Sequence, residues 1–151
     1  MTGVQTCALP ICNPRSSVCA VADRGHLYAI GGNSGTSGSV DIAERFDPKE
    51  KTWSRIASTK EKRGGAGGAA VNQKVYVFGG LGVNEGPDSK ACEMYDPATD
   101  MWSTMTITGP TGFASAVSFK GKIFVCGDFE QDNQNHTSLQ VYNPADRKSV
   151  V

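Results

Sequence analysis

Residues 63–80 read Arg63-Gly-Gly-Ala-Gly-Gly-Ala-Ala-Val-Asn-Gln-Lys-Val-Tyr-Val-Phe-Gly-Gly80. Two apolar stretches, 69–71 and 75–78, flank a short polar segment, which is the pattern of a β-hairpin. The second stretch is apolar on both faces, whereas a strand with one wet face would alternate. The pattern therefore predicts a hairpin that is covered on both sides.

The same pattern occurs twice more in the chain. Residues 15–32 and 111–128 align with residues 63–80 without a gap, although Gly127-Asp128 replaces the glycine pair in the last copy. The aromatic residue of the second stretch recurs at a spacing of 48: Tyr28, Tyr76 and Phe124. A later aromatic residue precedes Asp-Pro or Asn-Pro, and Trp follows it in the first two copies: Phe46, Tyr95 and Tyr142, with Trp53 and Trp102. Because Asp-Pro and Asn-Pro suit a type I turn between two further strands, each copy predicts four antiparallel strands.

These spaced motifs resemble kelch repeats. A period near 50 residues with an apolar strand, a glycine pair and a downstream aromatic residue plus Trp is typical of that β-propeller family. The resemblance implies an all-β fold, a partial kelch β-propeller of about three four-stranded antiparallel blades. The repeats would span about 15–62, 63–110 and 111–145, within a native region of 12–145.

The two ends of the chain differ from the repeats. Residues 1–11 and 146–151 resemble translated sequencing adapter. We therefore predict that both are non-native segments, leave them out of the fold prediction, and expect the natural chain to be longer on both sides. Resequencing the locus tests this prediction, because genomic reads that encode residues 2–11 in frame with the rest would contradict it.

Composition argues against several classes of protein. Fifteen Lys and Arg balance fifteen Asp and Glu, so no basic field is present to attract nucleic acid or an anionic membrane surface. No apolar run approaches the roughly 18 residues of a membrane span. Five cysteines without a Cys-x-x-Cys pair indicate neither a disulfide framework nor a zinc site. We expect a cytoplasmic protein with no metal site and no cofactor.

The recurring glycines and aromatic residues are interpreted as structural. A glycine pair cradles phosphate where a helix N-terminus follows, and here a polar loop and another strand follow. A recurring Trp beside a recurring aromatic residue indicates packing between blades more than a binding anchor. The residues predicted to have structural roles are Gly31, Gly32, Gly79, Gly80, Gly127, Tyr28, Tyr76, Phe124, Phe46, Tyr95, Tyr142, Trp53 and Trp102.

Function is expected in the parts that do not repeat. The start of the first strand, the end of the second and the start of the third lie on one rim of an antiparallel blade, so Arg15 and Arg63 are placed beside three variable loops. Kelch propellers that recruit partners are similar in using arginines of this face for acidic peptides, although Thr111 breaks that pattern here. The alternative is that these arginines are solvated or locally paired. The candidate partner-binding residues are Arg15, Arg63, Asn33, Ser34, Asn84, Glu85, Glu130 and Asp132.

The favoured hypothesis is a non-catalytic protein–protein interaction module without an enzyme activity. The strings at 44–48 and 93–97 look most like proteins that pair a BTB domain with kelch repeats. That resemblance implies a substrate-recognition propeller for a cullin-based ubiquitin ligase, or an actin-associated scaffold, with the cullin reached through a BTB domain of which no residue is present here. The alternatives are a secreted copper-radical oxidase, for which the chain shows no convincing set of Tyr, Cys and His ligands, and an extracellular adhesion protein.

Overall fold

The computed structural model describes residues 10–82, 92–105, 112–131, 134–146 and 148–150. Within those residues the chain forms β-strands and no helix, and three sheets contain four strands each. All pairings between neighbouring strands are antiparallel. The prediction of an all-β partial propeller with about three blades is therefore confirmed.

Each blade is one sheet, and its strands follow the order of the chain. The first blade contains β1 (Cys19–Asp23), β2 (His26–Ile30), β5 (Ala43–Asp47) and β6 (Thr52–Arg55), with β3 (Asn33–Ser34) and β4 (Gly38–Ser39) as a small separate hairpin. The second contains β7 (Gly67–Val71), β8 (Lys74–Phe78), β9 (Cys92–Asp96) and β10 (Met101–Met105). The third contains β11 (Ala114–Phe119), β12 (Lys122–Gln131), β13 (Gln134–Asn143) and β14 (Lys148–Val150).

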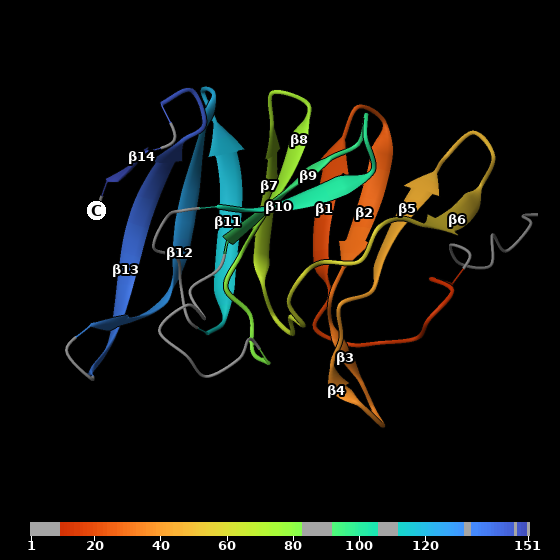
Figure 1. Ribbon diagram of the computed structural model, residues 1–151, viewed down its shortest axis with the longest axis horizontal. Coiled ribbons are helices and arrows are strands. Elements are labelled where there is room, and N and C mark those ends of the chain that lie inside the picture. Colours follow the sequence, from red (N-terminus) through yellow and green to blue (C-terminus); the bar gives the residue numbers. More distant parts are fainter. Residues whose placement is uncertain (1–9, 83–91, 106–111, 132–133, 147, 151) are drawn as a thin grey trace, which may run out of the picture.

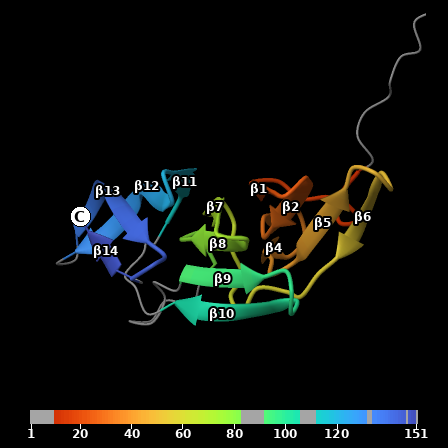
Figure 2. The same cartoon turned by 90° about the horizontal axis from the view of Figure 1, so that it is seen from above.

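The three blades stand side by side (Figure 1). Seen from above, the first strands β1, β7 and β11 line one side of the molecule, and the fourth strands lie away from it (Figure 2). Only the second blade has a neighbour on each face within the described chain. This explains why the strands of the repeat are apolar on both faces.

Aromatic residues pack across both junctions between blades. Tyr28 meets Tyr95 of the second blade with ring centroids 6.0 Å apart, and Tyr76 meets Tyr142 of the third at 5.8 Å. Each pair joins β2 or β8 to the third strand of the following blade, so the two tyrosines occupy equivalent environments. Phe124 holds the same register in β12, but it is half-buried and contacts Phe119 of its own blade.

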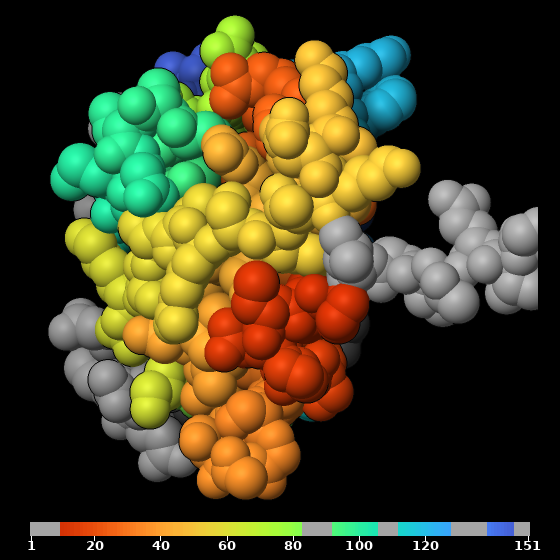
Figure 3. Space-filling view, turned by 90° about the vertical axis from the view of Figure 1, so that its right-hand side faces the viewer, coloured from red at the N-terminus to blue at the C-terminus, as the bar shows by residue number. Residues whose placement is uncertain are grey.

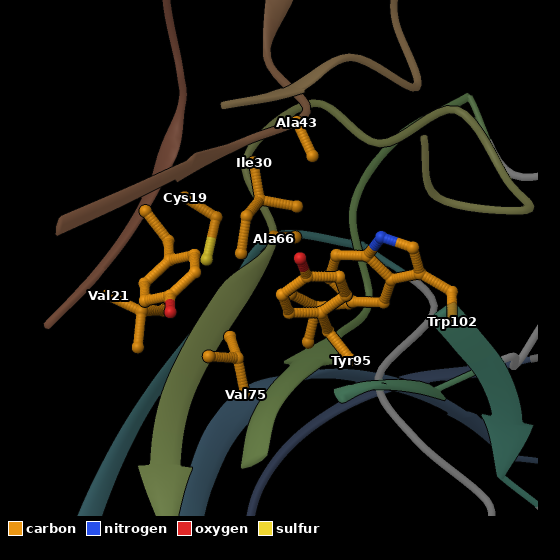
Figure 4. Close-up of a cluster of buried hydrophobic side chains, with 10 residues drawn as sticks. Cys19, Val21, Ile30, Ala43, Ala66, Val75, Tyr95 and Trp102 are labelled. Atoms are coloured by element: carbon orange, nitrogen blue, oxygen red, sulfur yellow. The ribbon is translucent and has the colours of Figure 1, made fainter. Parts of the chain in front are cut away.

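The first junction also buries an indole ring. Trp102 is 5% exposed, lies 5.0 Å from Tyr95 between ring centroids, and donates a 2.7 Å hydrogen bond from Nε1 to the carbonyl oxygen of Ala57 (Figure 4). Ala57 belongs to the segment that leaves the first blade, so this Trp connects two blades. Trp53 is the equivalent residue of the first blade, but it is only half-buried and packs on Phe46 of the same sheet.

The glycine pair at the end of β2 has a steric explanation. Gly31 and Gly32 have φ angles of 61° and 110°, in the region that side chains disfavour. A Cβ atom on Gly31 would overlap the carbonyl oxygen of Arg63 in the next blade. That oxygen accepts a 2.6 Å hydrogen bond from the Gly32 N–H. The pair therefore lets two backbones meet where one blade passes to the next.

The third blade departs from this pattern. Gly127 lies inside β12, paired with Ala114 and Ser138, and the strand continues to Gln131 instead of turning. This extension accords with the replacement of the second glycine by Asp128, because a side chain makes the positive φ angle less favourable.

The terminal segments were expected to be non-native. Residues 1–9 lie outside the described chain, whereas Lys148–Val150 forms β14 and pairs with β13. The backbone of the C-terminal segment thus fills the place of a fourth strand. Its origin stays a prediction that resequencing tests.

Candidate functional site

One rim of the molecule gathers the segments that the sequence analysis singled out. Isolated bridges join Ser16 to Asn33 and Gly64 to Leu81, so the start of a blade lies beside the segment that leaves the second strand. The β3–β4 hairpin projects from this rim, on the lower side of Figure 1. The rim therefore combines the entry to β1, β7 and β11 with the loops that follow β2 and β8.

Arg63 is buried inside the second blade. Its side chain is fully buried, and Nη2 lies 2.8 Å from Oε1 of Glu93, whose side chain is also fully buried. Nη1 donates a 2.7 Å hydrogen bond to the carbonyl oxygen of Gly79. The Glu93 carboxylate in turn accepts hydrogen bonds from the backbone N–H groups of Lys60 and Glu61. The ion pair thus fastens the entry segment of the blade to its second and third strands.

Arg15 makes the equivalent pair in the first blade. Nη1 contacts Oε2 of Glu44, and the two side chains are 1% and 0% exposed. The guanidinium also donates to the carbonyl oxygens of Asn13, Ala29 and Gly31. Burial alone would raise the pKa of Glu44, but the hydrogen bonds and charge of Arg15 outweigh it and hold that pKa below its ordinary value.

These contacts correct the expectation that Arg15 and Arg63 bind an acidic partner. A guanidinium without exposed surface cannot reach a partner, and each one already has a carboxylate within the blade. The local-pairing alternative describes both residues. The third repeat has Thr111 and Gln140 at the positions of the Arg and the Glu, and the Gln140 side chain is buried. A joint loss of both charges in one repeat was the sequence signal that could have revealed the pairs.

The structure describes some of the remaining candidate partner-binding residues. Asn33 and Ser34 form β3; Asn33 Oδ1 accepts a 2.8 Å hydrogen bond from the Ser39 hydroxyl, and Ser34 Oγ accepts one of 3.0 Å from the N–H of Ser37. Asn33 also packs against Gly64 of the next blade. The backbone of Glu130 lies in β12, while Asn84, Glu85 and Asp132 lie outside the described residues.

A groove runs across the first strands of the three blades. It has a volume of about 520 Å³ and is lined by residues 17–20, 65–68 and 113–116. These three sets are equivalent by the spacing of 48 and contain no charged residue. Backbone hydrogen bonds join them, from Gly65 N–H to Ser17 O at 2.9 Å and from Ala114 N–H to Gly65 O at 3.1 Å. The groove is therefore a neutral surface with a fixed backbone frame.

Two large apolar side chains of this rim were missed by the sequence analysis. Phe113 is 55% exposed at the mouth of the groove, and Leu81 is 43% exposed beside Gly64. The available signal for Phe113 was its register, because the equivalent residues are Ser17 and Gly65. Single exposed apolar residues are ordinary on protein surfaces, so Phe113 and Leu81 by themselves do not assign a site.

The described residues show little reactive chemistry. Burial raises the pKa of the Cys19 and Cys92 thiols to about 12, so both are protonated near neutral pH. No group of three His, Cys, Asp or Glu side chains in the described ranges is arranged to hold a metal ion. Within the same ranges, no helix has the length and apolar character to cross a membrane.

Comparisons with known proteins agree with the repeat pattern. The family described as Kelch motif matches residues 14–60 and 62–107, more than half of the chain. Kelch-like protein 26 of Danio rerio is 34% identical over 104 residues, which are 68% of this chain and 17% of that protein. An F-box/kelch-repeat protein of Arabidopsis thaliana is 32% identical over 122 residues, 81% of this chain and 31% of its own length. The chain thus spans less than a third of these relatives.

Proposed function

Because this chain belongs to the kelch-repeat family, we propose that it is part of a propeller that recognises another protein for a ubiquitin ligase. In this proposal, the whole protein joins the propeller to a second domain that docks on a cullin-based ligase, as a BTB domain would. The rim that carries the β3–β4 hairpin holds the partner, and no reaction is catalysed there. The protein acts in the cytoplasm.

The observation that carries the proposal is a difference in burial between the residues that recur in each repeat and those that do not. The recurring tyrosines Tyr28 and Tyr76 are buried in blade junctions, and the recurring arginines are buried in ion pairs. The rim, in contrast, exposes Leu81 and Phe113, which do not recur. Kelch-like and F-box/kelch-repeat proteins share this repeat with the chain. A scaffold with a constant interior and a variable rim suits recognition of a protein partner.

The test is affinity capture with the full-length protein and two matched substitutions. Thr36→Arg changes the exposed tip of the β3–β4 hairpin, and Thr99→Arg changes an exposed turn between β9 and β10 at the opposite rim. We expect Thr36→Arg to reduce recovery of a specific partner while Thr99→Arg retains it, with a cullin recovered by both variants. Equal recovery of the partner by both would contradict the rim assignment, and absence of a cullin would contradict the ligase assignment.

An actin-associated scaffold is the second candidate that the family resemblance suggests. No described contact favours it over the ligase adaptor. Co-sedimentation of the full-length protein with filamentous actin separates the two, because binding to the filaments would favour the scaffold.

A further inference from the structure

Two sheet faces of the molecule have no neighbouring blade within the described chain. One is the outer face of the third blade, where Val117, Phe119 and Leu139 are each at least 50% exposed. The other is the outer face of the first blade, where Leu27 is 46% exposed and Phe46 is half-buried. Single exposed apolar residues are ordinary, but several on one sheet face form a patch that favours an interface.

The outer face of the third blade repeats one half of each blade junction. Three of its residues follow, at the spacing of 48, the residues with which the first and second blades cover their next neighbour. The equivalent sets are Val21, Tyr28 and Ile30 in the first blade, Ala69, Tyr76 and Phe78 in the second, and Val117, Phe124 and Cys126 in the third. The first two sets are buried in the cores of the two junctions. The third set forms the same kind of surface with no blade over it in the described chain.

The outer face of the first blade repeats the other half of the junction. Its residues are equivalent to those that the second and third blades turn toward the preceding blade. These sets are Leu27, Ala29 and Phe46 in the first blade, Val75, Val77 and Tyr95 in the second, and Ile123, Val125 and Tyr142 in the third. The last two sets are buried in the junction cores. Because the first and third blades stand at opposite ends of the row (Figures 1 and 2), one molecule carries two complementary half-junctions that do not meet each other.

We propose that two copies of this chain associate, with the outer face of each third blade packed on the outer face of the first blade of the other copy. Phe124 of one copy would then meet Phe46 of the other, as Tyr28 meets Tyr95 at 6.0 Å within one copy. This inference goes beyond the proposed function and does not depend on it.

The number of copies follows from the symmetry of the contact. A contact that joins different surfaces of two identical chains forms either a closed ring or an open filament. Closed propellers have about four to eight blades. Two copies with three blades each meet this range, whereas three copies exceed it. The expected assembly is therefore a closed dimer with two contacts of the same kind.

The contact between copies should be weaker than the junctions inside one copy. At the first junction, the Gly32 N–H donates a 2.6 Å hydrogen bond to the carbonyl oxygen of Arg63. At the third blade, β12 continues through the equivalent Asp128 instead of turning. Two separate chains also lose translational and rotational freedom when they associate. We therefore expect a dimer that dissociates on dilution.

The experiment uses the whole chain of 151 residues, because a longer chain with further repeats would cover both faces itself. Sedimentation velocity over a range of concentrations measures the mass and the dissociation constant of the dimer for wild type, Val117→Lys, Leu27→Lys and Met101→Lys. Met101 is the matched control, since it is 64% exposed in a blade that has a neighbour on each face. Circular dichroism verifies folding, and Ser replaces Lys at any position where the spectrum changes.

We expect wild type to reach twice the 15.9 kDa of one chain. Val117→Lys and Leu27→Lys should each raise the dissociation constant by about tenfold or more, against less than about twofold for Met101→Lys. An effect of only one of the first two variants would mean that like faces pair with each other, and would overturn the inference. A monomeric wild type, a mass larger than that of two copies, or an equal loss in all three variants would overturn it as well.

Discussion

Trp102 and Trp53 hold the same position in successive repeats but lie in different surroundings. Trp102 is enclosed between the first and second blades, with its N–H bonded to Ala57. Trp53 is only half-buried and packs on Phe46 of its own sheet, with no preceding blade in the described chain to cover the pair. Figure 3 views the molecule from the side of the first blade, where the segment near residue 10 (red) lies beside residues coloured yellow. The difference shows that burial in this fold is a property of a junction between blades, since the same residue loses much of its cover when the junction is missing.

The largest loss of stability is expected when the buried Trp is truncated. Trp102→Ala should lower the free energy of unfolding by about 3–5 kcal/mol, because it empties a buried junction. Trp53→Ala should cost about 1–2 kcal/mol, because that ring is only partly buried and packs within its own sheet. Urea unfolding followed by circular dichroism measures both. Equal losses in the two variants would show that the first blade is covered as well as the second.

The buried ion pair of the second blade provides the next test. Arg63→Thr should cost about 3 kcal/mol, since it leaves the fully buried Glu93 carboxylate without its partner. The double variant Arg63→Thr/Glu93→Gln copies the residues of the third repeat and should recover most of that loss. Urea midpoints compare wild type with the single and double variants. A double variant as unstable as the single one would mean that the third blade tolerates Thr111 and Gln140 for another reason.

Acid should weaken the pair of the first blade. The pKa of Glu44 is lower in the folded chain than the ordinary value of about 4.3, so its stabilising effect is complete above that value and is lost as the pH falls through the folded pKa. Glu44→Gln should cost about 1.5 kcal/mol at neutral pH, the value of a charge-assisted hydrogen bond. The difference between variant and wild type should narrow below pH 4. Melting temperatures measured across that range check the sign, and a constant difference would contradict it.

The smallest effect on stability is expected at the open face of the third blade. Phe119 and Leu139 are both exposed there, so Phe119→Ser/Leu139→Ser should change the free energy of unfolding by less than about 1 kcal/mol. The same double variant should reduce self-association, because it removes part of an exposed apolar face. Dynamic light scattering at increasing concentration measures this. Unchanged association would show that another surface, such as the first blade, is responsible.

The blades could be predicted from the sequence because the residues that pack between them recur at a fixed spacing. The equivalent tyrosines and the glycine pairs report a repeated environment, and three copies make the register unambiguous. The rim was harder to interpret. An arginine at the entry of a blade fits either an exposed contact or a buried pair, and its carboxylate partner lies 29 or 30 residues downstream. The choice between an exposed contact and a buried pair depends on how β5 or β9 packs against the entry segment, and the sequence alone does not give that packing.

Phe113 was missed for a different physical reason. Sequence analysis treats a position that varies between repeats as a loop, whereas the groove is built from positions that share a register but differ in side-chain size. The empty space at Gly65 and the ring that fills it come from neighbouring blades. Such complementarity appears only when the blades are placed next to each other.

The hydrogen bonds that link Ser17, Gly65 and Ala114 use main-chain atoms alone. Substituting the side chain at position 17 or 113 thus leaves the links between blades chemically unchanged. A lineage could exchange Ser for Lys or Phe for Tyr at these positions and change the chemistry of the surface while the spacing of the sheets stays constant. The architecture can stay constant while the exposed side chains change, because the links between these strands use main-chain atoms alone.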